Sequence, residues 1–190
     1  MNTINYIENE EYKSGIIEIN RPEQLNALNN NVITDLKNQL DLIKNSSTIR
    51  SVIIKGSGDK AFVAGADIKE FQHFTSQEAR HLSKTGKIEL FDKIANFNKP
   101  IIAAINGYAL GGGLELALSA HIRIVSTTAK LGLPECSLGL IPGYSGTQRL
   151  PRIIGVNRAM EMILTAKMIS AEEAYRIGLV NYVVSKEELL

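Results

Sequence analysis

Two glutamates, Glu115 and Glu135, are the residues whose type and setting could support acid/base chemistry. Glu115 stands in the apolar stretch Gly111 to Ala120, and Glu135 stands in the apolar, Gly- and Pro-punctuated segment Leu131 to Gly143. A carboxylate in the first turn of an apolar helix is favoured by the helix dipole, and partial burial would tune its proton affinity. Two such acids on separate elements could exchange protons with water and a substrate. Taken singly, Glu135 would more commonly be explained as a solvated loop acid.

Two turns rich in small residues could supply backbone N–H groups to the same chemistry. In Ala61 to Lys69 a short apolar run is followed by small residues and then by a polar turn. Such a turn can direct a backbone N–H group toward a carbonyl oxygen of a ligand. The alternative is an ordinary loop after a strand. In Asn106 to Glu115 a glycine triplet leads into a helix, whose first N–H groups have no intrahelical partner. A phosphate-binding loop is improbable there. The segment lacks the lysine of a P-loop, and Leu116 stands where the dinucleotide-binding motif GxGxxG has its third glycine. Close packing of the helix on its strand is the structural alternative.

Other reactive side chains show weaker patterns. The three histidines, His73, His81 and His121, have no metal-ligand spacing and are expected to be surface or structural residues. Ser145 lies one residue short of a GxSxG elbow and is not expected to be a nucleophile. For Arg149 the simplest interpretation is a structural ion pair.

Composition narrows the class of protein. The 190 residues suit one domain, and 21 basic against 20 acidic residues give a formal charge of +1 without a basic run, so nucleic acid is not expected as a partner. The one cysteine, Cys136, excludes an internal disulfide and fits a reducing cytoplasm. Met1 to Tyr12 has no apolar export signal, and no run reaches the roughly 18 apolar residues of a membrane span. A soluble cytoplasmic protein is expected.

The elements that must position these residues alternate along the chain. Strands are predicted where short β-branched runs end in turn formers, and helices where apolar residues recur at helical spacing. One long helix, Ser76 to Phe97, is predicted to begin with Ser76 as its cap and to bury Leu82, Ile88, Phe91, Ile94 and Ala95. The predicted strands are 15–19, 51–55, 101–105, 122–125 and 180–184, and the other predicted helices are 32–43, 111–120, 156–165 and 171–177. This alternation indicates the α/β class, and leaves a doubly wound sheet and a coiled stack of ββα turns both open.

Five ordered blocks of sequence resemble the enoyl-CoA hydratase/isomerase (crotonase) family, and within it the enoyl-CoA hydratases. The resemblance covers essentially the whole chain, and the combination of blocks is more specific than any single one. It implies a crotonase-like spiral of ββα repeats in one core domain, residues 1–190. The blocks are Asn20-Arg21-Pro22 with Asn26-Ala27-Leu28; Ala64-Gly65-Ala66-Asp67-Ile68; Gly107 to Glu115; Pro134-Glu135; and Pro142-Gly143 with Gly146-Thr147-Gln148-Arg149-Leu150.

The resemblance also implies roles for individual residues. The backbone N–H groups of Ala66 and Gly112 would form an oxyanion hole for a thioester carbonyl. Glu115 and Glu135 would hold the attacking water, Glu135 would protonate the α-carbon, and Gly143 would help to place the water. Both acids are present in hydratases, whereas many other members of the family keep one. The residues expected along the coenzyme A path are Ala27, Leu28, Ala64, Ala66, Asp67, Ile68, Lys69 and Gly112.

The implied activity is that of a hydro-lyase in acyl-CoA metabolism of the fatty-acid β-oxidation kind. It adds water syn to a trans-2-enoyl-CoA and gives a 3-hydroxyacyl-CoA, without a metal or redox cofactor. Coenzyme A belongs to the substrate, and the family implies a homotrimer or a dimer of trimers, a hexamer. The alternatives are a Δ3,Δ2-enoyl-CoA isomerase and a catalytically silent acyl-CoA-binding relative. The second alternative arises because the chain stops near Glu187, so the family's C-terminal helical trimerisation region is expected to be absent.

Three further residues depart from the family pattern. Leu133 stands where hydratases commonly have glutamine and Ser145 stands where glycine is common, and we expect both to tune substrate choice. His121 replaces a common aspartate and is expected to be structural.

Overall fold

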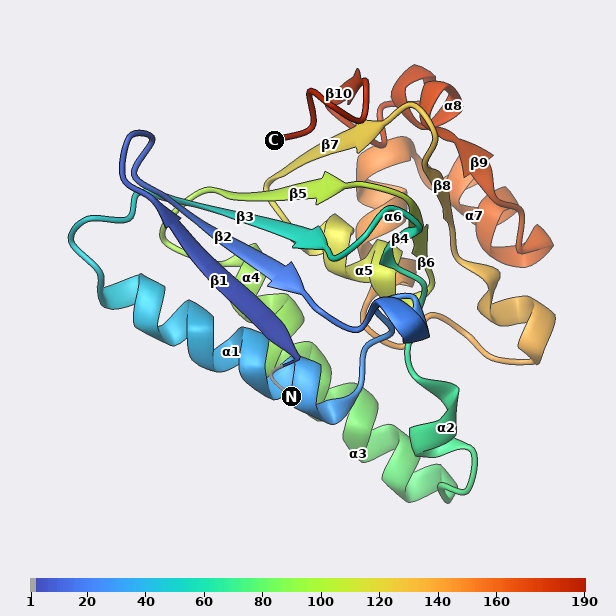
Figure 1. The fold of residues 1–190 in the computed structure, drawn as a ribbon. Coiled ribbons are helices and arrows are strands. Elements are labelled where there is room, and N and C mark those ends of the chain that lie inside the picture. Colours follow the sequence, from blue (N-terminus) through green and yellow to red (C-terminus); the bar gives the residue numbers. More distant parts are fainter. Residues whose placement is uncertain (1–2) are drawn as a thin grey trace.

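The computed structural model describes residues 3–190, so Met1 and Asn2, the first residues of the segment predicted to lack an export signal, lie outside it. Its larger sheet has six strands in the order β1-β2-β3-β5-β7-β10 (Figure 1). All neighbours are parallel except β1 and β2, which form an antiparallel hairpin. The strand bounds are β1 Ile4–Asn9, β2 Ser14–Ile19, β3 Ser51–Gly56, β5 Ile101–Ile105, β7 Ile122–Ser126 and β10 Tyr182–Val184.

A smaller sheet of four strands, β4-β6-β8-β9, stands beside the first. Each of the pairs β3/β4, β5/β6 and β7/β8 sends one strand to the larger sheet and the next to the smaller one, and helices follow the first two pairs. This arrangement confirms the predicted spiral of ββα turns and excludes the doubly wound sheet. The bounds are β4 Ala61–Val63, β6 Tyr108–Leu110, β8 Lys130–Gly132 and β9 Ile169–Ser170.

The helices cover the sheets and carry the polar loops between them. In Figure 1, α1 and the run from α3 to α4 lie on the same side of the larger sheet, and Lys37 of α1 bonds Glu89 between them at 2.8 Å. The α-helices are α1 Asn30–Asn45, α2 Ile68–Phe71, α3 Ser76–Gly86, α4 Asp92–Ala95, α5 Gly112–Ser119, α6 Gly146–Ile154, α7 Val156–Thr165 and α8 Ala171–Arg176; η1 Pro22–Gln24 and η3 Pro134–Leu138 are 3-10 helices, and η2 Lys87–Phe91 is a π-helix.

The long helix differs from its prediction in two ways. Thr75, not Ser76, is the N-cap, because Thr75 and Glu78 form a reciprocal capping box. The π-turn η2 inserts an extra residue into the helical repeat, so Leu90 is fully buried whereas Ile88 is 53% exposed. The predicted buried face is therefore wrong at Ile88 and at the exposed Ala95.

Helix α5 packs unusually close to β4. A Cβ on Gly113 would lie 2.0 Å from the carbonyl oxygen of Val63, so only glycine permits this contact. A Cβ on the preceding Gly112 would have no neighbour nearer than 3.6 Å. The structural explanation of the glycine triplet is thus correct for Gly113 and does not account for Gly112.

The polypeptide contains no membrane-crossing candidate among the helices of residues 3–190, since none is both long and apolar enough.

Candidate active site

The predicted acids and turns meet at one cavity of about 270 Å³. Its wall is mostly apolar, and both glutamates face into it. The lining residues come from the end of β4 and α2, from α3, from the β6–α5 junction, from η3 and from the loop before α6. They are Ala64, Gly65, Ala66, Ile68, Ala79, Leu82, Ser83, Leu110, Gly111, Gly112, Glu115, Pro134, Glu135, Leu138, Leu140, Ile141, Gly143 and Tyr144.

Glu115 is buried in the first turn of α5, with 1% of its surface exposed. Its Oε1 accepts hydrogen bonds from the backbone N–H groups of Tyr144 at 2.8 Å and Gly146 at 2.6 Å. The intervening Ser145 has φ +80°, a left-handed conformation that is uncommon for residues other than glycine. Burial, together with the nearby charge of Glu135, raises the pKa of Glu115 from 4.5 to about 7, although the two N–H bonds oppose the rise.

Glu135 lies in η3, directly after Pro134, and is half-buried. Its Oε1 approaches Gly111 so closely that a Cβ there would be 2.9 Å away. Within residues 3–190 no hydrogen-bond partner reaches its buried Oε2. Burial therefore raises the pKa of Glu135, because the ionised form would leave a charged oxygen without a donor.

Ala66 and Gly112 place their backbones side by side. Leu28 forms an isolated parallel bridge with Ala66, in which Leu28 N–H donates to Gly65 O at 2.8 Å and Asp67 N–H donates to Leu28 O at 2.7 Å. Gly112 is the first residue of α5, where N–H groups have no intrahelical acceptor. A Cβ on Gly112 would lie 3.6 Å from the nitrogen of Ala66, which brings the two predicted donors to the same part of the cavity.

The predicted coenzyme A residues divide into two groups. Ala64, Ala66, Ile68 and Gly112 line the cavity, whereas the other four residues do not. Arg21 joins two of those four, since its guanidinium donates to Ala27 O at 2.6 Å and to Asp67 Oδ2 at 2.8 Å. The four residues outside the lining are Ala27, Leu28, Asp67 and Lys69.

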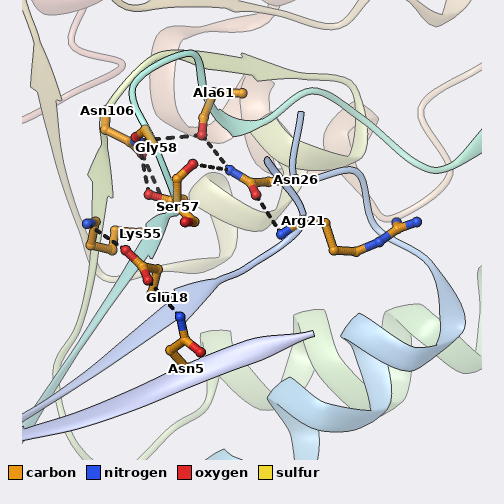
Figure 2. Close-up of polar contacts among 10 residues, drawn as sticks. Asn5, Glu18, Arg21, Asn26, Lys55, Ser57, Gly58, Ala61 and Asn106 are labelled. Carbon is orange, nitrogen blue, oxygen red and sulfur yellow. Dashed lines mark hydrogen bonds and ion pairs between the residues drawn. The ribbon is translucent and has the colours of Figure 1, made fainter. Parts of the chain in front are cut away.

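Two buried asparagines hold the turn that precedes β4 (Figure 2). Asn26 donates to Ser57 O at 2.9 Å and to Ala61 O at 2.8 Å. Asn106 accepts from Gly56 N–H at 3.1 Å and donates to Gly58 O at 2.7 Å. These amides satisfy backbone groups that the turn leaves unpaired, and so they fix β4, which leads directly into Ala64 to Ala66.

The loop before α6 contributes more than the sequence predicted. The predicted Gly143 lines the cavity, and Ser83 Oγ donates to its carbonyl at 2.6 Å. The donors Tyr144 and Gly146 and the contact from Ser83 were not predicted; the only sequence signal for them is the turn-forming segment Gly143-Tyr144-Ser145-Gly146. Arg149 forms the predicted ion pair, with Asp92 at 2.7 Å.

The histidines lie where the sequence predicted. His73 and His81 are exposed, and His121 Nδ1 accepts a hydrogen bond from Ile101 N–H at 2.9 Å, a structural role between β5 and β7. In the described part of the chain no group of three or more His, Cys, Asp or Glu side chains is arranged to hold a metal ion.

Comparison with known proteins agrees with this geometry. The family described as Enoyl-CoA hydratase/isomerase matches residues 11–190. A crotonyl-CoA hydratase from Syntrophomonas wolfei is 47% identical over 98% of this chain and 71% of its own, and a short-chain-enoyl-CoA hydratase from Clostridium acetobutylicum is 46% identical over the same shares. The crystal structure of an enoyl-CoA hydratase from Bacillus anthracis superposes with a TM-score of 0.93 at 42% identity, covering 98% of this chain and 72% of that one. The chain belongs to the enoyl-CoA hydratase/isomerase family.

Proposed function

We propose that this protein is an enoyl-CoA hydratase, which adds water syn across the double bond of a trans-2-enoyl-CoA to give a 3-hydroxyacyl-CoA. The observation that carries the proposal is the pair of carboxylates, Glu115 and Glu135, that face one apolar cavity with raised pKa values. The names of the two similar bacterial hydratases support the same activity.

The two acids suit different steps of the addition. Glu115, with a pKa near neutrality, accepts a proton from water as the hydroxyl adds to the β-carbon. Glu135, whose pKa is also raised, delivers a proton to the α-carbon from its unpartnered Oε2. Solvent then returns the proton from Glu115 to Glu135. Such acid/base catalysis contributes about a hundred- to ten-thousandfold.

The backbone donors complete the proposed mechanism. The N–H groups of Ala66 and Gly112 would bind the thioester carbonyl as an oxyanion hole, and negative charge on that oxygen grows as the enolate forms. Removing one such donor costs about a hundred- to a thousandfold in other enzymes. Water addition is redox-neutral, so the proposal requires no redox cofactor, and coenzyme A arrives as part of the substrate.

A spectroscopic assay tests the proposal. Hydration of crotonyl-CoA removes the absorbance of the conjugated enoyl thioester, and we expect turnover by the wild type. Glu135→Gln should lower the rate about a hundredfold or more, while Glu161→Gln, at an exposed position of α7, should leave it unchanged.

Two further outcomes separate the alternatives. Binding of the ester without turnover by the wild type would identify a silent acyl-CoA-binding protein and end the hydratase proposal. Faster turnover of a 3-enoyl-CoA, spared by Glu115→Gln, would identify an isomerase instead.

Assembly and compartment are predictions that rest on the family resemblance and on Cys136. We propose a cytoplasmic protein that forms a homotrimer or a dimer of trimers, provided that the family's C-terminal helical region is dispensable for assembly. Sedimentation velocity checks the assembly, and a monomer at micromolar concentration would contradict it.

A further inference from the structure

Both hydrogen bonds to Glu115 come from the short loop 143–146. Side chains of α3, α4 and α6 contact this loop or the residues that bind it. The donors belong to the 143–144 and 145–146 peptide units, which are separated by the single 144–145 unit. The middle unit joins the two donor units, so their relative orientation depends on the torsion angles at both of its ends. A contact that fixes the carbonyl of the middle unit therefore restrains the geometry of both bonds.

Arg149 holds that carbonyl. Its Nη1 donates to Tyr144 O at 2.8 Å, and its Nη2 donates to Asp92 Oδ1 at 2.7 Å. Asp92 is in turn paired with Lys87 at 2.5 Å. The guanidinium side chain is only 16% exposed, and a planar fork that engages two acceptors has little freedom to move.

Neighbouring contacts hold the rest of the loop. Ser83 donates to Gly143 O, the carbonyl of the first donor peptide. The ring of Tyr144 stacks on Phe91 at 4.4 Å between centroids and 10° between planes. A Cβ on Gly86 would lie 2.7 Å from the same ring, so glycine is required beneath it. The left-handed Ser145 is a conformation that persists only where its surroundings fix it in this way.

We propose that Arg149, oriented by Asp92, is a positioning residue for hydration: it fixes the 143–146 loop so that the two backbone N–H groups hold Glu115. This role goes beyond the ion pair between α6 and α4, and it rests on the proposed hydratase function for its kinetic consequence.

Arg149 also acts on Glu115 through its charge. Its positive charge lowers the pKa of Glu115, against the larger rise caused by burial. The other titratable groups around this carboxylate are Glu135 of η3 and the phenol of Tyr144, whose pKa burial raises to about 12. Farther out, Asp92 and Lys87 act through Arg149, and Glu70 of α2 acts on Tyr144. Loss of Arg149 would remove the cation and loosen the two N–H bonds, and both changes raise the pKa of Glu115.

The test compares Arg149→Gln with Arg152→Gln. Arg152 lies on the same helix, is exposed, and bonds only Gln148 among the described residues. The carboxyl ¹³C signal of Glu115, assigned by its loss in Glu115→Gln, is titrated in each variant. Arg149→Gln should raise the pKa of Glu115 and lower kcat by about ten- to hundredfold with KM little changed. Arg152→Gln should change neither.

Arg149→Lys separates charge from geometry. It retains the cation but not the two-pronged contact, so the pKa of Glu115 should return toward the wild-type value while kcat recovers only in part. Circular dichroism confirms that each variant is folded at the assay temperature, and Asp92→Asn provides a milder variant should Arg149→Gln unfold.

Each outcome decides the question. A Glu115 titration and a kcat in Arg149→Gln equal to those of Arg152→Gln would show that the ion pair is structural only. If the wild type lacks hydratase activity, the proposed function fails, and the ¹³C titration still tests positioning because it needs no turnover.

Discussion

Replacing Glu115 by glutamine should stabilise the protein above neutral pH. Glutamine keeps an oxygen that can accept from Tyr144 and Gly146, and it removes a carboxyl that burial makes costly to ionise. The pKa of this carboxyl is 4.5 in its ordinary state and about 7 in the folded protein. At about 1.4 kcal/mol per pH unit, the difference corresponds to about 3 kcal/mol.

The sign follows from proton binding in the two states. Below pH 4.5 the carboxyl is protonated in both the folded and the unfolded chain, so ionisation costs nothing. Between 4.5 and about 7 the unfolded chain loses the proton first, and the stability of the wild type falls as pH rises. Above about 7 both states are ionised and the full cost remains. Glu115→Gln does not titrate and escapes this loss.

Urea unfolding monitored by circular dichroism at pH 5 and pH 8 measures the effect. The free energy of unfolding of Glu115→Gln minus that of the wild type should be about 2 to 3 kcal/mol larger at pH 8. Glu10→Gln, at an exposed position, serves as the matched control. A difference between variant and wild type that is the same at both pH values would refute the assignment of a raised pKa to Glu115.

Three further substitutions test the backbone around the site. Gly113→Ala should cost at least about 2 kcal/mol of stability, since its Cβ would lie 2.0 Å from Val63 O; an unchanged urea midpoint would contradict the close packing of α5. Gly112→Ala should fold normally, with no contact below 3.6 Å, yet lose about a hundredfold or more of hydration because the methyl would occupy space beside Ala66 N that the thioester oxygen needs; full activity would remove Gly112 from the oxyanion hole. Asn106→Ala should lower stability by about 2 kcal/mol in the same urea assay by leaving buried backbone groups unpaired, and a neutral result would show that water replaces the amide.

Periodicity predicted the elements that carry a long apolar pattern. Helix α1 contains the whole of the predicted helix 32–43, and α7 has the predicted bounds. Strands β2, β3 and β5 lie within one residue of their predictions. These segments succeed because local spacing alone determines which face is buried. The strands of the smaller sheet have two or three residues each, too few for any period, and β4, β6, β8 and β9 escaped prediction as strands for that reason.

The sequence predicted which residues form the site, but it did not predict the hydrogen bonds that connect them. Glu115, Glu135, Ala66 and Gly112 came from motifs whose chemistry is legible in sequence. The donors to Glu115 come from backbone N–H groups about 30 positions later, and the residue types of Tyr144 and Gly146 do not encode that contact. The π-turn was likewise not predicted, and within it Leu90 is buried in place of Ile88.

Both backbone bonds to Glu115 end on the same oxygen, and this asymmetry has a stereochemical consequence. With Oε1 occupied by two donors, Oε2 is the more basic oxygen, so water loses its proton toward one fixed side of the carboxylate. The nucleophile consequently approaches one face of the planar enoyl group. Hydration should yield a single enantiomer at C3, with its handedness depending on the loop whose backbone donors occupy Oε1.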